Sequence, residues 1–546
     1  MNRKISLIAL FLLSIQCFSQ TPAWLWAQNA GSTDGDWSYS VKTDENGNVY
    51  FAGSFKSATI SFGTFTLNNT IAGSNDLFLV KYDNNQNVLW ALSYGGSGSD
   101  VASSIDVDEA GNIYLGGYFT SPSINFGGGI TVTRTGGSDI LAVKLDSNGA
   151  AQWAKTAVGN GNEEVEDINV DVLGNLYVVG YFESANCTFG TITLTNQGYY
   201  DGFLVKYDML GNVVSAYGYG GSMWDNCKGI ISDDAGNVYM TGFYRSDITF
   251  GDTTLINGTG DAHLFVAKYN SSGEYIWVKN STGTWEVGNE IAVDNTNGVY
   301  VTGFFQGTTM SCDGLSLSNN GTSGTSDFFV IKYDQNGNPQ WLTGGGNIDY
   351  EEGRGIDADD NGNVYVGAYF SSATISIGST TITNNGAGDI LVIKYQSDGS
   401  FSWVLNAGGD ADDQVHSLSA GNDGRAFICG SFSSSSISFG NTTFMNNGIA
   451  DIFVAEAGDN FTGIQSEKGV EEISVFPNPA NQFIILTTNP EMAGKGYFLT
   501  DAMGIIVYRG ILTNEINSID ISNFRNGPYY LVFLENGGFN IKIIKI

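Results

Sequence analysis

The 546-residue chain contains few of the residues that most often carry catalytic or metal chemistry. It has 2 histidines, 5 cysteines and 7 prolines. A histidine-based metal centre or catalytic triad is therefore an improbable basis for function, and the chain has neither a Gly-x-Ser-x-Gly nor a His-Glu-x-x-His motif. We interpret His263 and His416 as ordinary surface or strand residues.

Basic charge is also scarce. The chain has 23 Lys and Arg against 56 Asp and Glu, a formal net charge of -33. A field of this sign repels phosphate backbones and anionic lipid headgroups, so we expect no nucleic-acid partner. Hydrophobic residues make up 42% and charged residues 14%, a composition that predicts a folded chain.

Long apolar runs are missing after the first twenty residues. Arg3 and Lys4 precede an apolar run over residues 5–15, and the small side chains of Cys17 and Ser19 suit a signal peptidase. We predict a signal peptide over residues 1–20, because the run is about half the length of a membrane span. Lipid attachment at Cys17 is an alternative, although Gln16 stands where that attachment needs a small residue. We expect no transmembrane segment in the mature chain.

Glycine and aromatic residues are abundant, with 73 Gly, 33 Phe and 27 Tyr, which favours aromatic-rich strands joined by tight turns. The phrase Gly-Asn-x-Tyr, or a variant of it, recurs at intervals of 61 to 65 residues and marks seven copies of one unit. Its aromatic residue is found at Tyr50, Tyr114, Tyr177, Tyr239, Tyr300, Tyr365 and Phe427.

Within each unit, apolar and polar residues alternate over four segments, which predicts four strands. Asp-x-x-Gly-Asn sequences such as Asp44 to Asn48 join them and are interpreted as hairpin turns. Seven such units predict an all-β fold, a seven-bladed β-propeller of four-stranded blades over residues 21–460. The units are longer than a WD repeat, and the excess lies in one segment, as at residues 60–67.

Both ends of the repeat array are incomplete. Trp26 has the phase of a strand that ends a unit, whereas the last unit runs through residues 451–454 and has no such strand. We therefore predict that the N-terminal strand completes the seventh blade. Cysteines remaining after the signal peptide have different phases and are interpreted as isolated buried thiols; they are Cys187, Cys227, Cys312 and Cys429.

An acidic residue occurs 14 positions before the repeat aromatic in every unit. These residues are Asp36, Asp100, Glu163, Asp225, Glu286, Glu351 and Asp413. One interpretation is that each carboxylate caps backbone N–H groups at a blade junction. The other is that the seven form a ring at the channel mouth that binds a cation, with calcium as the candidate.

The recurring pattern of Gly-Gly, an acid, an apolar strand, Asp-x-x-Gly-Asn-x-Tyr and Asp-x-Phe-x-x-Lys-Tyr-Asp resembles the SBBP family of seven-bladed propeller repeats. The resemblance covers about residues 24–457 and implies a secreted propeller without implying a reaction.

After the array, residues 461–472 are polar and aperiodic, as expected of a linker, and residues 473–546 contain strands enough for a small C-terminal β-sandwich. This segment resembles the type A C-terminal sorting domain of the type IX secretion system. The residues that carry the resemblance are Pro477, Asn478, Pro479, Gly504, Gly527 and Tyr529. The resemblance implies a Bacteroidetes-type bacterium, recognition by the type IX machinery, and removal of the segment when the protein is released or anchored at the cell surface.

These features favour a non-enzymatic protein, secreted or held at the outer-membrane surface, that binds an extracellular glycan or protein through propeller loops. The alternative is an extracellular polysaccharide-active enzyme that uses carboxylates of those loops.

Overall fold

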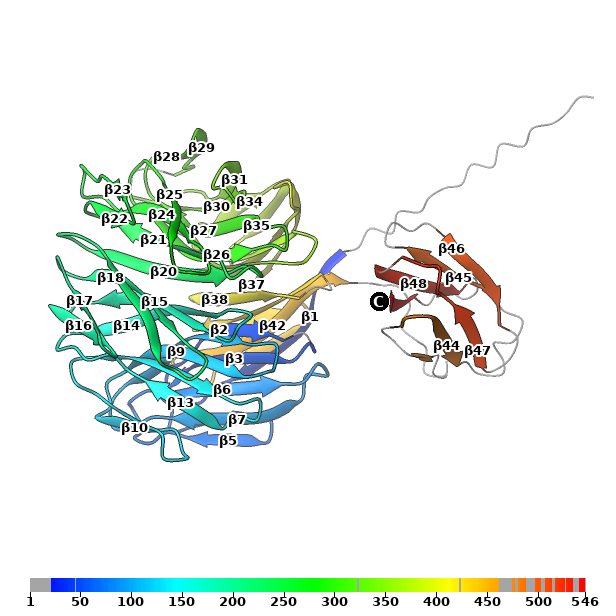
Figure 1. The fold of residues 1–546 in the computed structure, drawn as a ribbon, viewed down its shortest axis with the longest axis horizontal. Coiled ribbons are helices and arrows are strands. Elements are labelled where there is room, and N and C mark those ends of the chain that lie inside the picture. The colour runs from blue at the N-terminus through cyan, green and yellow to red at the C-terminus, as the bar shows by residue number, and fades with distance from the viewer. Residues whose placement is uncertain are drawn as a thin grey trace, which may run out of the picture. The chain divides into compact units, whose positions relative to one another are not determined.

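The computed structural model of the chain describes residues 21–44, 46–321, 324–421, 424–460, 474–476, 480–487, 496–501, 506–512, 516–525, 527–533 and 540–545. Two compact units are present, Pro22–Asp459 and a C-terminal unit that begins at Asn460 (Figure 1). The predicted signal peptide, 1–20, and linker, 461–472, lie outside the described residues.

Seven four-stranded antiparallel sheets make up the described part of the first unit. Their innermost strands are β2 (Asp36–Thr43), β8 (Asp100–Val107), β14 (Glu163–Val170), β20 (Asp225–Ser232), β26 (Glu286–Val293), β32 (Glu351–Ala358) and β38 (Asp413–Ala420). The second strands are β3 (Val49–Phe55), β9 (Ile113–Phe119), β15 (Leu176–Phe182), β21 (Val238–Tyr244), β27 (Val299–Phe305), β33 (Val364–Phe370) and β39 (Arg425–Phe432).

The outer two strands complete each blade. The third strands are β6 (Asp76–Tyr82), β12 (Asp139–Leu145), β18 (Asp201–Tyr207), β24 (His263–Tyr269), β30 (Asp327–Tyr333), β36 (Asp389–Tyr395) and β42 (Asp451–Asn460). The fourth strands are β7 (Val88–Tyr94), β13 (Ala151–Lys155), β19 (Val213–Tyr219), β25 (Tyr275–Asn280), β31 (Pro339–Gly345), β37 (Phe401–Ala407) and, from the other end of the chain, β1 (Thr21–Ala30).

The sheets form a closed ring, because each innermost strand packs against the innermost strand of the next blade and β38 packs against β2. The chain is therefore a β-propeller, as predicted. Closure occurs through the N-terminal strand, since the seventh sheet has the order β1-β42-β39-β38. Trp26 in β1 is half-buried, with its ring centroid 5.4 Å from that of Tyr82.

Local sequence explains the turns between the first two strands of a blade. In the first blade, Oδ1 of Asp44 accepts the backbone N–H groups of Asn46 and Asn48, each at 2.9 Å. Gly47 takes a φ of +75°, in the left-handed region that favours glycine. Tyr50 Oη donates to Oδ2 of the same carboxylate at 3.1 Å. The turn thus fixes both the hairpin and the repeat tyrosine, whose ring is fully buried.

The core lies between adjacent blades rather than inside any one blade. The second and third strands are buried along their whole length in the first blade, and their side chains pack on the next blade. One cluster joins Tyr50 and Leu79 of the first blade to Ile105 and Leu115 of the second. This packing requires the ring, because an isolated blade would expose both faces of its sheet.

The extra segment of each unit forms a small hairpin outside the four-stranded sheet. These hairpins are β4–β5 (Thr59–Phe62, Phe65–Asn68), β10–β11 (Ser123–Asn125, Thr131–Thr133), β16–β17 (Asn186–Phe189, Ile192–Thr195), β22–β23 (Ile248–Phe250, Thr253–Leu255), β28–β29 (Thr309–Cys312, Leu315–Ser318), β34–β35 (Thr374–Ile377, Thr380–Thr383) and β40–β41 (Ser436–Phe439, Thr442–Met445). In Figure 1 the hairpins labelled β16–β17, β22–β23 and β28–β29 lie at the periphery of the propeller. All four described cysteines are buried free thiols, as predicted.

The C-terminal unit contains two sheets that share one hydrophobic core. One has the order β43 (Ser474–Phe476), β44 (Phe483–Thr487), β47 (Ile516–Asp520); the other has the order β46 (Ile506–Ile511), β45 (Gly496–Asp501), β48 (Gly527–Phe533), β49 (Asn540–Lys545). Of the predicted sorting residues, Gly527 begins β48, and Tyr529 is buried with its hydroxyl donating to the Arg525 carbonyl at 2.9 Å. Pro477, Asn478, Pro479 and Gly504 lie outside the described residues. In the described parts of the chain, no helix is long and apolar enough to cross a membrane.

Candidate ligand-binding site at the channel

The seven acids found from the repeat each open an innermost strand and are completely buried. Asp413 is representative. Its Oδ1 accepts the backbone N–H groups of Ser433 and Ser434, both at 3.1 Å, and its Oδ2 accepts the Ser434 hydroxyl at 2.7 Å. Equivalent bonds to a serine 21 residues downstream occur at Asp36, Asp100, Glu163, Asp225 and Glu351. These contacts are those of the capping interpretation.

Each of these acids also faces a second buried side chain, which begins the third strand of the preceding blade. In six junctions this residue is an aspartate, so two carboxylates repel each other in each. The pairs are Asp76 with Asp100, Asp139 with Glu163, Asp201 with Asp225, Asp327 with Glu351, Asp389 with Asp413, and Asp451 with Asp36.

Burial, with repulsion from the paired carboxylate, raises the pKa to about 6 at Asp201, Asp327, Asp389 and Asp451. Oδ1 of each of these four residues has no hydrogen-bond partner in the described structure. A buried acceptor without a hydrogen-bond partner favours the protonated carboxyl, because protonation removes the buried charge.

The junction between the fourth and fifth blades differs from the others in its chemistry. His263 takes the place of the aspartate, and its Nδ1–H donates to Oε2 of Glu286 at 2.8 Å. Ser281 Oγ donates to the same oxygen at 3.0 Å. A donor group therefore stands here where the other junctions hold a second carboxylate.

The structure does not gather the seven acids around one point; each is engaged at its own junction. Among the described residues, no group of three or more His, Cys, Asp or Glu side chains is arranged to hold a metal ion. Cation binding by Asp36, Asp100, Glu163, Asp225, Glu286, Glu351 and Asp413 stays the second of the two interpretations, and the experiment that decides between them is given in the Discussion.

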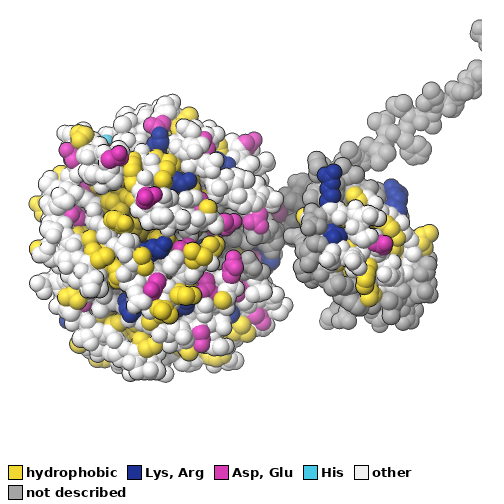
Figure 2. Space-filling view, in the orientation of Figure 1, with side chains coloured by type: hydrophobic (Ala, Val, Ile, Leu, Met, Phe, Trp, Pro, Cys, Tyr) yellow, Lys and Arg dark blue, Asp and Glu magenta, His cyan; other side chains and the backbone are white. Residues whose placement is uncertain are grey.

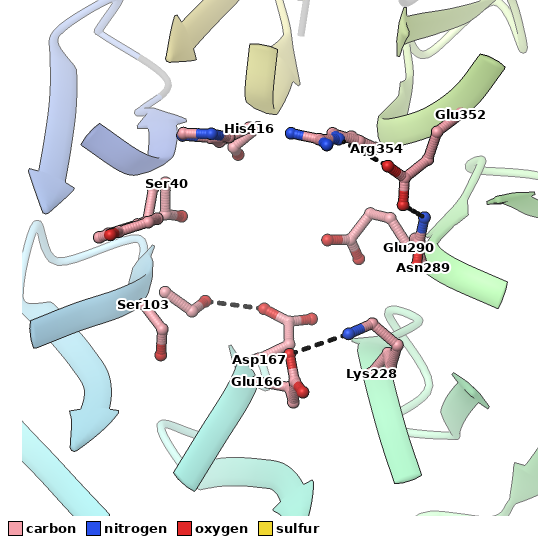
Figure 3. A pocket seen from close by; sticks show the side chains of 13 residues that line it. Ser40, Ser103, Glu166, Asp167, Lys228, Asn289, Glu290, Glu352, Arg354 and His416 are labelled. Atoms are coloured by element: carbon pink, nitrogen blue, oxygen red, sulfur yellow. Dashed lines mark hydrogen bonds and ion pairs between the residues drawn. The ribbon is translucent and has the colours of Figure 1, made fainter. Parts of the chain in front are cut away.

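A different set of side chains reaches the channel. Every innermost strand has a β-bulge three residues after its acid, where the register with the second strand shifts. The bulged residues are Tyr39, Ser103, Glu166, Lys228, Asn289, Arg354 and His416. Their side chains line a central cavity of about 260 Å³, and Figure 3 shows polar groups from successive blades arranged around an open centre.

Several of these side chains are fixed by ion pairs or stacking. Lys228 lies 3.2 Å from Glu166, and Arg354 donates to Glu352 at 2.9 Å. The ring of His416 stacks on Tyr39 with centroids 5.5 Å apart. Burial lowers the pKa of His416 to about 4, so this imidazole is neutral at physiological pH. His416 is a strand residue of β38, as interpreted from the sequence, and its side chain lines the channel.

Deeper in the same channel, a cavity of about 60 Å³ is lined by acidic groups. Burial raises the pKa of Asp167 to about 6. Burial also raises the pKa of Glu290 well above its usual value, and repulsion from Asp167 adds to this shift. Lys42 is the nearby cation and lies 3.6 Å from Asp106. This part of the channel is therefore acidic, whereas the bulged residues present groups of both signs.

Three of the innermost strands are preceded by an aromatic residue, and these three residues are called the aromatic rim. Trp224, Trp285 and Tyr350 directly precede the acids that open β20, β26 and β32. Tyr350 lies 6.2 Å from Tyr369 between ring centroids, and the Arg354 guanidinium lies 5.3 Å above the Tyr369 ring. Tyr350 and Tyr369 thus adjoin the cavity, because Arg354 lines it. Acidic side chains are dispersed over the propeller face drawn in Figure 2 and form no single patch there.

Comparison with known proteins identifies the C-terminal segment and supports the repeat architecture. Residues 474–546 match the secretion system C-terminal sorting domain, which directs export through the type IX secretion system to the cell surface or the extracellular space. An uncharacterized WD repeat-containing protein, L264 of Acanthamoeba polyphaga mimivirus, is 24% identical over 624 aligned residues, covering 95% of this chain and 44% of the viral protein.

Regulatory protein FlaEY of Caulobacter vibrioides is 26% identical over 220 residues, which cover 38% of this chain and 23% of FlaEY. The chain therefore spans less than half the length of these curated relatives. Among solved structures, Sqt1 from Chaetomium thermophilum has a TM-score of 0.36 at 10% identity, covering 78% of this chain and 86% of Sqt1. The β-propeller domain of the trilobed protease from Pyrococcus furiosus has a TM-score of 0.39 at 8% identity, covering 80% of this chain and all of that domain.

Proposed function

We propose that this exported propeller is a binding protein without catalytic activity. It binds an extracellular glycan or protein ligand in the part of its channel that the bulged residues line. The observation that supports this proposal is the set of seven bulges. The backbone device is the same in all blades, yet it presents seven different side chains to one cavity. A ring of fixed, dissimilar polar groups is suited to selecting one ligand orientation.

A screen of the full-length protein on glycan and protein arrays tests this proposal. Arg354→Ala and Lys228→Ala each remove a cation from the cavity wall, so we expect at least a tenfold loss of affinity for the ligand that the screen identifies. Lys155→Ala is the control, because Lys155 ends a fourth strand, β13, away from the channel. A ligand bound equally by all three variants would place the site elsewhere.

The polysaccharide-active alternative depends on the acidic part of the channel, where Asp167 and Glu290 have raised pKa values. Incubating the bound glycan with the protein and analysing its chain length separates the two functions. An unchanged glycan supports binding alone. Cleavage that disappears in Asp167→Asn or Glu290→Gln would establish the enzyme.

Export can be tested with a chain that ends at Gly463. Removal of the sorting domain deletes no propeller strand, so we expect the truncated protein to fold and accumulate in the periplasm. Immunoblots of the medium, surface and periplasmic fractions measure the outcome. Normal amounts in the medium or at the surface would contradict the role of the tail.

A further inference from the structure

Arg245 directly follows β21 in the fourth blade, and its guanidinium contacts two tryptophan rings. Its guanidinium carbon is 4.9 Å from the ring centroid of Trp224 and 4.7 Å from that of Trp285. Nε donates to the carbonyl of Gly260 at 2.9 Å, and the backbone N–H donates to Asp225 at 2.8 Å. The side chain is therefore held by stacking and one backbone bond, with its terminal nitrogens left for another partner.

Arg245 forms no ion pair with a described carboxylate, unlike the cation at the same repeat position and the cations of the channel. Lys56 occupies the same repeat position in the first blade, and its ammonium group lies 3.8 Å from Asp34. Arg354 and Lys228 are paired with glutamates. No described carboxylate forms an ion pair with Arg245, although acids outnumber bases by more than two to one in this chain.

Flat aromatic surfaces extend from this arginine. Tyr200 stacks on Trp224 with an interplanar angle of 4°, and Tyr181 lies 4.7 Å from Tyr200 between centroids. Trp224 remains 40% exposed. Trp285 has a φ of +57°, in the region that non-glycine residues rarely adopt. The strained backbone places its indole against the guanidinium, which suggests that this arrangement serves a ligand.

We infer that Trp224, Arg245 and Trp285 form a subsite for a sugar that carries one carboxylate, such as a uronic acid. This inference rests on the proposed binding function and names the ligand class for one part of the rim. The guanidinium offers parallel N–H donors that match a carboxylate, and stacking between the indoles keeps it from rotating. The exposed part of Trp224 offers an apolar surface against which a pyranose ring can pack.

The surrounding charge restricts the ligand further. Asp225 accepts the backbone N–H groups of Arg245 and Gly221. Burial and the negative charges of Glu166 and Glu183 contribute to the raised pKa of the neighbouring Tyr200. A long polyanion would be repelled by these acids and by the net charge of -33. A short glycan with a single carboxylate avoids most of this repulsion, especially at 0.15 M salt, where the Debye length is about 8 Å.

Calorimetric titration of the full-length protein with a glucuronate-terminated disaccharide and with its methyl ester tests the inference. We expect the acid to bind at least tenfold more tightly than the ester, and Arg245→Gln to abolish this preference. Arg245→Lys should restore only part of it, because an ammonium group lacks the paired donors. Lys56→Gln is the matched control, since it removes one positive charge at the same repeat position, and we expect no change.

The outcomes separate this inference from the proposed function. Equal binding of acid and ester, or an unchanged preference in Arg245→Gln, would overturn the carboxylate subsite. If neither disaccharide binds while another ligand depends on Arg354 and Lys228, the subsite is wrong and the channel function stands. If no array ligand depends on the channel either, both fail. Circular dichroism of each variant shows whether the fold is retained.

Discussion

Two positions on the innermost strands, three residues apart, behave in opposite ways. The first residue of the strand is acidic in all seven blades and makes the same capping bonds in most of them. The bulged residue has a different side chain in every blade and faces the channel. The repeated residue makes the contacts that hold the ring together, whereas the variable residue faces the surface that a ligand can reach.

The junction acids also show that strict repetition need not be stabilising at every pH. Six junctions place two buried carboxylates together, and the seventh substitutes His263 for one of them. The capping bonds stabilise the junctions because they satisfy backbone N–H donors. Below about pH 6 a proton relieves this repulsion at Asp201, Asp327, Asp389 and Asp451, whereas the remaining junction has an imidazole in place of the second carboxylate.

The largest expected effect on stability comes from deleting the strand that completes the seventh blade. Deletion of residues 21–31 removes β1, so the last sheet loses its outer strand and Phe453 loses its cover. We expect the free energy of unfolding to fall by more than about 5 kcal/mol, because two half-buried tryptophans and two buried alanines are lost. Chemical denaturation measures the change. Stability equal to that of the intact protein would show that β1 does not close the ring.

The two kinds of position can be compared directly on β38. Asp413→Ala leaves the N–H groups of Ser433 and Ser434 and the hydroxyl of Ser434 without their buried acceptor, which predicts a loss of about 3 kcal/mol or more. His416→Ala removes one hydrogen bond to the Ser38 carbonyl and one ring contact, which predicts about 1–2 kcal/mol.

Ligand affinity should respond in the reverse order. His416→Ala is expected to weaken binding, whereas any Asp413→Ala protein that remains folded should bind normally. Denaturation curves and calorimetric titrations of the two variants give both quantities. Equal losses of stability would remove the distinction between the junction and the channel.

The propeller could be predicted from the sequence because its signals keep a fixed phase. The repeat tyrosine, the Asp of the turn and the junction acid each stand at a constant distance from one another. The aspartate that begins the third strand belongs to the Asp-x-Phe-x-x-Lys-Tyr-Asp pattern, but its role at the blade junction was missed, since loops of varying length place it 24 to 27 residues after the repeat aromatic. Its pairing with the next blade's acid is visible only when the two strands lie side by side.

The channel residues were missed for a different reason. The bulge is a backbone feature that no single residue type marks, so Tyr39 and His416 share nothing recognisable in sequence. Seven different residue types at one position of an otherwise regular repeat are a signal from which the channel-facing position could be predicted. The rim stack around Arg245 depends on three blades at once, and a search for one repeated motif does not detect it.

Protonation of the junction pairs gives the next effect in size. The folded pKa of about 6 at Asp201, Asp327, Asp389 and Asp451 exceeds the unfolded value of about 3.9. The folded state then binds more protons than the unfolded state between these values, so stability falls as pH rises from about 4 through about 6 and is level above that range. We expect a loss of about 1–3 kcal/mol per pair. Denaturation at pH 5 and pH 8 measures it.

Asp389→Asn tests the assignment at one junction. Asp413 is the charged group that faces Asp389, whereas the loop acids Asp410 and Asp412 bind Ser435 and Tyr369. The amide is neutral and can donate to Asp413, so the variant should be more stable than the parent at pH 8 and nearly equal to it at pH 5. A variant that is less stable at pH 8 would show that the Asp389–Asp413 repulsion is not the source of the pH dependence.

The smallest expected effect is that of calcium. A cation that binds only the folded protein raises its stability with concentration, and a ring of seven free carboxylates would do this. The junction acids are instead buried and already accept backbone and serine donors, so we expect calcium and chelator to leave the melting temperature at pH 8 unchanged. Replacing Asp100, Asp225 and Asp413 with Asn should weaken the capping bonds, and the loss of stability should be the same with and without calcium. A calcium-dependent rise in the parent that disappears in the triple variant would instead establish these carboxylates as a cation site, and the position that repeats most strictly would then have a ligand of its own.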